Sequence, residues 1–264
     1  MIQENSESDS DEKMRALIES GTDIVTGSVG GALGFLAGGP AGAAALGAGG
    51  IMAGKVLKKF GKEISDRFLG PREAVRVGAV IAIAAEEIRE RLERGDDLRQ
   101  DDFFEERQFG RSDADEVTES AVLKCQKDPQ EKKIPYVARL FSNIVFDSEI
   151  GLDMSHQLLK LAERLSYRQF CLLRLAVMKQ DGQLRATDYR EQGNFSPSLY
   201  QVLHECLDLY QRGLINNGGD VAFGVTDINP GGMTIQGMGA ALYNNLGLAR
   251  IPNEDLVPLR AVLR

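Results

Sequence analysis

Hydrophobic residues recur at helical spacing through the middle of the chain, between residues 71 and 165. Over 71–94 they mark one face of a helix that starts at Pro71 and stops at Gly95. The same spacing predicts a helix that Ser112 or Asp113 caps, and two more over 136–146 and 153–165. The pattern therefore predicts a helical bundle over 71–165. The predicted inward face of its first helix consists of Val77, Ile81, Ala84, Ile88 and Leu92.

After residue 165 the helix-capping and turn signals change. Ser166 and Gln169 form a capping box that opens a helix over 167–179, and Asp181-Gly182 predicts a turn. Ser196-Pro197 opens a second long helix, which Gly213 ends. The predicted core face of this second helix consists of Leu199, Leu203, Cys206, Leu207 and Tyr210.

The chain beyond Gly213 predicts a small β-hairpin over 214–228, turning around Asn217-Gly218-Gly219. A last helix is predicted over 234–247. The order of helix, short helix, helix, hairpin and helix is that of a winged helix. We therefore predict a mainly α protein whose residues 166–264 form a winged-helix-like domain with a small β-hairpin.

The most unusual stretch is residues 24–54, which contain no charged side chain. Eleven of its 31 residues are Gly and eight are Ala, so an isolated helix in water would be unstable, because each Gly costs about 1 kcal/mol relative to Ala. Small residues four apart share one helix face and let another helix approach closely. The predicted self-association or membrane-contact stripe consists of Gly30, Gly34, Gly38, Gly42, Gly50 and Gly54.

Gly39-Pro40 lies near the middle of this stretch, so two short helices fit better than one straight membrane span. We predict a glycine-zipper helical hairpin, with its flanks, over residues 12–70. Two alternatives stay open: a tightly packed hairpin in a soluble core, and a flexible linker. The large apolar residues Val29, Leu33 and Phe35 argue against the linker.

A basic run follows the glycine-rich stretch directly. Lysines beside an apolar segment attract anionic lipid head groups, and they stay on the cytoplasmic side of a membrane. The alternative is an ordinary amphipathic helix with Val56, Phe60, Ile64 and Phe68 turned inward. The predicted head-group ligands are Lys55, Lys58, Lys59 and Lys62.

The chain begins with an acidic, polar tail, residues 1–11, which we predict to be disordered. Its charge is the opposite of a secretory signal, and no signal peptide is expected. The whole chain has a formal net charge of −8, which argues against general attraction to nucleic acid. Residues 86–119 carry 14 acidic and six basic side chains, which is the same net charge. Without the order of a calcium loop, they predict a solvated charged face rather than a metal site.

Chemistry-bearing residues are sparse and scattered. The three cysteines are far apart, which predicts buried thiols in a reducing cytosol. Neither His156 nor His204 has a ligand-like partner nearby in the sequence. The sequence lacks a phosphate loop, a hydrolase elbow, a kinase signature and zinc-ligand spacing, so we expect no enzyme, cofactor or metal.

The second long helix of the winged-helix-like domain would be its recognition helix. Its expected outward residues include Glu205 and Asp208, and its one basic residue, Arg212, lies at the end. Carboxylates facing DNA phosphates repel them. The sequence therefore predicts a scaffold or protein-contact module rather than a DNA reader.

The layout of the chain over 74–247 resembles the bacterial Abi-alpha abortive-infection proteins. The resemblance rests on KIPYVARLFSNIVFD, LSYRQFCLLRLAVM, SPSLYQVLHECLDLYQRGLI and MTIQGMGAALYNNLGL, and it covers no catalytic motif. It implies a role in phage defence. The glycine-rich hairpin is argued from its residues alone.

Together these observations predict a cytoplasmic effector, peripheral to or inserted in the inner membrane. Its expected partners are membrane lipid, further copies of itself and an unidentified protein trigger. One alternative is a winged-helix transcriptional or nucleic-acid-binding regulator. The other is a soluble self-assembling structural protein.

Overall fold

The computed structural model describes residues 69–107, 110–178 and 184–264. The chain divides into two compact units, the first ending at Arg164 and the second running over Leu165–Arg264. The predicted tail over 1–11, the glycine-rich hairpin with its basic flank through residue 68, and the turn at Asp181-Gly182 lie outside the described residues. The prediction of a mainly helical protein with one small antiparallel sheet is confirmed.

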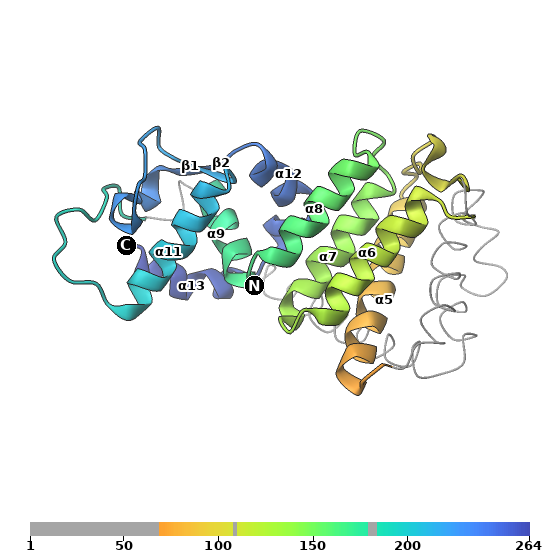
Figure 1. Cartoon of the computed structure of the whole chain (residues 1–264), viewed down its shortest axis with the longest axis horizontal. Coiled ribbons are helices and arrows are strands. Elements are labelled where there is room, and N and C mark those ends of the chain that lie inside the picture. Colours follow the sequence, from red (N-terminus) through yellow and green to blue (C-terminus); the bar gives the residue numbers. More distant parts are fainter. Residues whose placement is uncertain (1–68, 108–109, 179–183) are drawn as a thin grey trace. The chain divides into compact units, whose positions relative to one another are not determined.

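Unit 1 is a helical bundle (Figure 1). Its longest helix, α5, packs against α6 and α7, and α8 packs against the same two helices. The helices predicted over 71–165 are found, with ends within a few residues of the expected ones. In chain order the elements are α5 (Pro71–Glu93), η1 (Asp102–Phe104), α6 (Asp113–Lys127), η2 (Glu131–Lys133), α7 (Ile134–Ile144) and α8 (Leu152–Arg164).

The helix α5 is buried around its whole circumference from Val77 to Ala85, rather than along one face. The prediction of a single inward stripe was therefore too narrow, and Leu92, expected in that stripe, is only half-buried. No polar side chain lies between Arg76 and Glu86, so this part of the helix has no face that prefers water. The helix α5 therefore holds the segment around residue 71 firmly in the bundle.

The helix α6 starts at the predicted cap: the Ser112 hydroxyl accepts a hydrogen bond from the Asp115 backbone, and the Asp115 carboxylate accepts one from the Ser112 backbone. Its connection to α7 carries a buried cation, Lys133, whose side chain is 2% exposed. The Lys133 ammonium pairs with Asp128 and donates to the Glu163 carbonyl at 3.0 Å. These bonds tie the connection to the end of α8.

Unit 2 contains helices around a two-stranded sheet (Figure 1). The predicted caps are confirmed: Ser166 and Gln169 form the capping box of α9, and the Ser196 hydroxyl caps α11. In chain order the elements are α9 (Tyr167–Val177), α11 (Pro197–Gln211), β1 (Ile215–Asn217), η3 (Val225–Asp227), η4 (Pro230–Gly232), β2 (Met233–Ile235), α12 (Met238–Asn245), η5 (Leu248–Arg250) and α13 (Asn253–Val262).

The partner of the first strand differs from the prediction. Ile215 pairs with Ile235, and Asn217 with Met233, instead of with residues directly after the glycine turn. Residues 220–228 form no strand, because the Asp227 carboxylate accepts hydrogen bonds from the backbone of Phe223 and Gly224 and closes a tight loop.

Three further expectations about unit 2 were wrong in detail. Residue 234 lies in β2, so the helix expected from there starts at Met238 as α12. The helix α13, which contains Pro258, was not predicted. On α11, Leu199, Leu203 and Cys206 are buried as predicted. Leu207 and Tyr210 are only half-buried, and Val202 and Leu209 are buried in their place.

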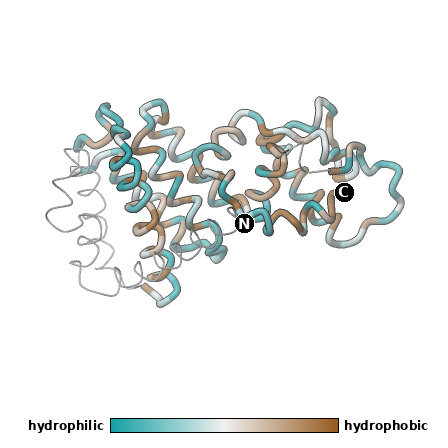
Figure 2. Tube along the Cα trace, turned by 180° about the vertical axis from the view of Figure 1, so that it is seen from behind, coloured by the Kyte–Doolittle hydropathy of each residue, from teal (hydrophilic) through white to brown (hydrophobic). Residues whose placement is uncertain are grey.

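Outside the apolar middle of α5, hydrophobic and hydrophilic residues intersperse along the helices of both units, as amphipathic packing requires (Figure 2). The prediction of buried thiols is confirmed, since all three cysteines are free and buried. Burial raises the pKa of Cys125 and of Cys206 to about 12. Because only the thiolate is a strong nucleophile, these two side chains act as small apolar core residues.

Candidate functional site

The residues predicted to contact membrane or a second copy of the chain lie outside the described part of the structure. This holds for the glycines from Gly30 to Gly54 and for the lysines from Lys55 to Lys62. Their predicted roles therefore stay predictions. Among residues 69–107, 110–178 and 184–264, no helix combines the length and the apolar character that a membrane crossing requires.

The acidic stretch over 86–119 is only in part the solvated face that its composition predicted: seven of its 14 carboxylates are exposed and three are buried. Glu86 and Asp115 are buried together with Arg99 and Asp113. Arg89 donates to both Glu86 carboxylate oxygens at 2.6–2.9 Å, and Asp115 takes part in the cap of α6. A charged side chain can be buried when a partner of opposite charge or a hydrogen-bond donor compensates it. Tertiary pairing has therefore drawn part of this charge into unit 1.

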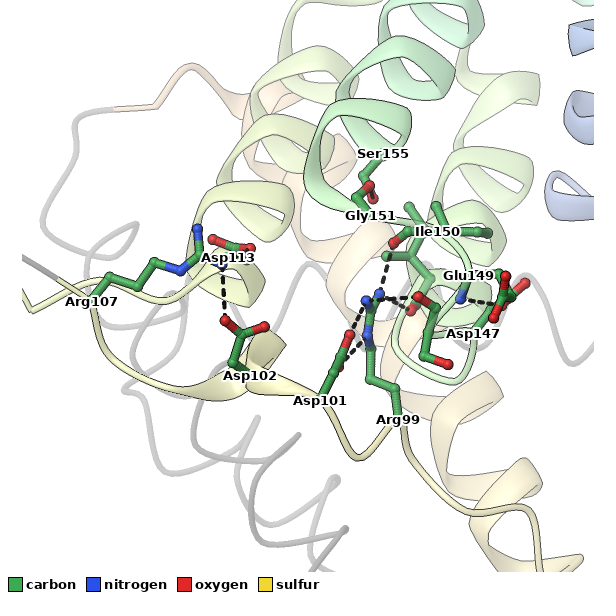
Figure 3. A network of polar contacts seen from close by, with 12 residues as sticks. Arg99, Asp101, Asp102, Arg107, Asp113, Asp147, Glu149, Ile150, Gly151 and Ser155 are labelled. Carbon is green, nitrogen blue, oxygen red and sulfur yellow. Dashed lines mark hydrogen bonds and ion pairs between the residues drawn. The ribbon is translucent and has the colours of Figure 1, made fainter.

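An open cleft of about 530 Å³ lies where the segment over 99–113 meets the turn between α7 and α8 (Figure 3). Arg99, from the first segment, donates to backbone carbonyls of the turn. The residues that line the cleft are Arg99, Asp101, Asp102, Phe103, Arg107, Asp113, Ser148, Gly151, Leu152, Asp153 and Met154.

Arg99 is the centre of the cleft wall, and its side chain is only 3% exposed. Its guanidinium binds the Asp101 carboxylate through two atoms, at 2.7 and 2.5 Å. It also donates to the carbonyls of Ile144 and Ile150, at 3.2 and 2.9 Å, and lies 4.2 Å over the ring of Phe103. The hydrogen bonds from Arg99 lower the pKa of Asp101. Arg99 therefore acts as a clamp on the turn after α7.

Arg107 lies at the other end of the cleft, beside two carboxylates (Figure 3). Its guanidinium is 2.8 Å from an Asp113 oxygen and 3.4 Å from an Asp102 oxygen. Burial raises the pKa of Asp113 above its ordinary value, and the Arg107 charge opposes that rise. Asp102 is 67% exposed, so the rim of the cleft offers carboxylate oxygen to solvent.

The ion pairs among the lining residues hold the walls of the cleft together, and the exposed Asp102 carboxylate at the rim can attract a cationic group. Its titratable lining consists of arginines and aspartates, and the described residues hold no cluster of three or more metal-ligating side chains. The sequence did not point to this cleft. Arg99 contacts carbonyls 45 and 51 residues away, and such distant partners leave no local pattern.

We expect the Arg99→Met substitution to destabilise unit 1 by about 3 kcal/mol, because it removes a buried cation that donates to the Ile150 carbonyl and leaves Asp101 without its ion-pair partner. Urea unfolding of the full chain measures the change. Arg72→Met is the control, since Arg72 is 78% exposed in its ion pair and should contribute less than about 0.5 kcal/mol. Equal midpoints for the two variants would contradict the role of Arg99 as a clamp.

The outer face of α11 also differs from expectation. Glu205 is bound by Arg168 at 2.6 and 2.7 Å, and Asp208 accepts hydrogen bonds from Gln169 and Arg212. The two carboxylates expected to face outward are thus used inside unit 2. Of the other residues expected on that face, Gln201, His204 and Gln211 are exposed and carry no carboxylate, and Arg212, exposed at the end, pairs with Asp208.

Comparisons with known proteins complete the description of these sites. A scan against protein-family models and searches of curated proteins and solved structures find no match to this chain.

Proposed function

We propose that the protein is a bacterial antiphage effector of the abortive-infection kind, whose glycine-rich hairpin associates with or perturbs the inner membrane. One observation carries the proposal: 31 uncharged residues, with glycines four apart, lead directly into a basic run. Close helix packing in a bilayer uses such small-residue spacing. In this proposal the two helical units hold the hairpin and control its release or self-association.

The position of α5 supports a holding role for unit 1. The helix starts at Pro71, soon after the basic run, and its middle is buried on all sides. A segment joined to so deeply packed a helix is tethered to a folded body. Cell fractionation of the full-length protein with and without infection tests the proposal. We expect infection to raise the membrane-bound share; an unchanged cytosolic distribution, together with unprotected cells, would rule the proposal out.

The basic run gives a quantitative prediction. Replacing Lys55, Lys58, Lys59 and Lys62 together by Gln should weaken binding to anionic vesicles, because each lysine near such a surface contributes about 1 kcal/mol. Flotation with vesicles that contain phosphatidylglycerol measures the loss, and neutral phosphatidylcholine vesicles are the control. Unchanged flotation would reduce the run to an ordinary amphipathic helix.

The winged-helix order predicted for unit 2 favours a second candidate, a nucleic-acid-binding regulator, although residues 184–196 form no helix between α9 and α11. Affinity for duplex DNA comes largely from cations on phosphates. On the exposed side of α11, Arg212 is engaged by Asp208 at 2.8 Å, and in the nearby loop Arg190 is engaged by Asp227 at 2.7 Å.

We therefore expect no shift of duplex DNA of mixed sequence at sub-micromolar protein, in a titration at about 50 mM salt. The measurement is fluorescence anisotropy of a labelled duplex, with a basic DNA-binding domain as positive control. Salt-dependent binding in this range would promote the regulator over the membrane effector.

A further inference from the structure

Two helices of unit 2 form a surface that neither the cleft nor the membrane proposal uses. We call it the α9–α13 seam. Residues 174 and 177 share one face of α9, which residue 178 follows directly, and residues 253, 257 and 260 share one face of α13. The two faces meet, since Arg174 donates to the Asn253 side chain at 2.9 Å and Arg260 approaches the Met178 sulfur at 3.8 Å.

The two arginines of the seam have donors without acceptors. Arg174 Nη1 and Arg260 Nε are buried and have no hydrogen-bond partner. Within the described residues, neither guanidinium forms an ion pair. By contrast, Arg168 is paired with Glu205 in the same unit. Both side chains are half-buried, so an oxyanion can approach each guanidinium, and a donor without an acceptor favours such a partner.

Exposed aliphatic side chains flank these arginines. Val177 is 40% exposed and Val257 is 58% exposed, one on each helix of the seam. Of the two carboxylates at the start of α13, Asp255 accepts a hydrogen bond from the Tyr167 hydroxyl, and Glu254 is exposed. The seam therefore presents two guanidinium groups between apolar surfaces, which fits an acidic peptide segment.

Charge distribution indicates which segment this is. Residues 165–264 contain nine basic and nine acidic side chains, and the net charge of −8 equals that of residues 86–119, which lie in unit 1. The first 12 residues contain no basic side chain, and their carboxylates alternate with serines. These carboxylates are Glu4, Glu7, Asp9, Asp11 and Glu12.

We propose that the α9–α13 seam of one copy of the chain binds the acidic segment over 4–12 of a second copy. Charge complementarity and the unmet donors of Arg174 and Arg260 carry the assignment. This inference rests on the proposed function for its consequence, since a tail-to-seam contact would supply the self-association that the effector needs. The binding itself can be measured without a membrane.

The first experiment measures a labelled peptide, MIQENSESDSDEK, binding to the full-length chain by fluorescence anisotropy. The receptor carries amides in place of its own five tail carboxylates, so that its own tail does not compete. We expect saturable binding that weakens with salt, and about a tenfold or greater loss of affinity in the Arg174→Gln, Arg260→Gln double variant.

Arg190→Gln is the matched control, because it removes an exposed charge from the same unit without touching the seam. A peptide with its five carboxylates changed to amides should not bind. Equal peptide affinity in the double variant and the control would overturn the proposal. So would anionic vesicles that bind through the seam while the peptide does not, since a lipid surface would then be the ligand.

Stability gives a second readout that separates loss of a site from loss of the fold. Because the buried donors have no partner in the free chain, the double variant should unfold at an equal or higher urea concentration than the parent. If the double variant is folded and retains full affinity for the peptide, the seam is not the binding site and the proposal is overturned.

Analytical ultracentrifugation of the unmodified chain tests whether the acidic segment that binds the seam comes from a second copy. We expect association that is lost both in the double variant and after tail neutralisation; a monomer at all concentrations overturns it. A negative result in these binding assays does not bear on vesicle flotation or phage protection. The binding at the seam and the proposed function can therefore be refuted independently.

Discussion

The Gly239→Ala variant is expected to lose about 3 kcal/mol or more of the stability of unit 2. A Cβ atom at residue 239 would lie 1.9 Å from the Leu214 carbonyl oxygen and 2.7 Å from its carbon. That carbonyl cannot move freely, since it accepts a hydrogen bond from the Gln236 backbone at 3.0 Å. The clash is therefore with fixed backbone, and α12 has to move away from the start of β1.

Urea unfolding and amide hydrogen exchange across α12 and β1 measure this effect. Gly193→Ala is the matched control, because residue 193 is exposed and an added Cβ there has nothing within 4 Å. The control should stay within about 0.5 kcal/mol of the parent. If Gly239→Ala were as stable as Gly193→Ala, the close approach of α12 to Leu214 would be wrong.

The Gly34→Leu variant is expected to remain folded and expressed but to lose toxicity and phage protection. Leucine raises both helix propensity and hydrophobicity, so a plain membrane anchor would tolerate it. A close-packed assembly would not, because only small residues let two helix backbones meet. One substitution thus separates an anchor from a glycine zipper.

Plaque counts and growth after induction measure the Gly34→Leu phenotype, with immunoblots to show equal protein levels. Leu33→Ile is the control: it lies beside the stripe, keeps its hydrophobicity and should be nearly silent. Full activity of Gly34→Leu would mean that the stretch is only an anchor or a linker, and the proposed function would then need another source of self-association.

Features that depend on neighbours in the sequence could be predicted from the sequence. The capping pairs Ser112 with Asp115 and Ser166 with Gln169 act within one helical turn. Gly95 and Gly213 adopt positive φ at the helix ends that they were expected to mark. The helices of unit 1 and the first two of unit 2 follow from such signals together with apolar spacing.

Features that depend on distant residues could not be predicted. Residue 215 pairs with residue 235 across a long loop, although a nearer strand was expected. The cleft, the Arg99 clamp and the α9–α13 seam have no motif, because each joins segments far apart along the chain. The acidic stretch shows the same limit: composition predicted solvation, whereas Arg89 makes burial of Glu86 possible.

The sequence by itself determined where most helices begin and end, and which stretch lacks charge. The tertiary structure decided which charges are buried, which strand completes the sheet and which arginines keep unmet donors. The physical reason is the distance along the chain over which each interaction acts. Caps, turns and helical periodicity act over three or four residues, whereas pairing and desolvation depend on whatever residues the fold brings into contact.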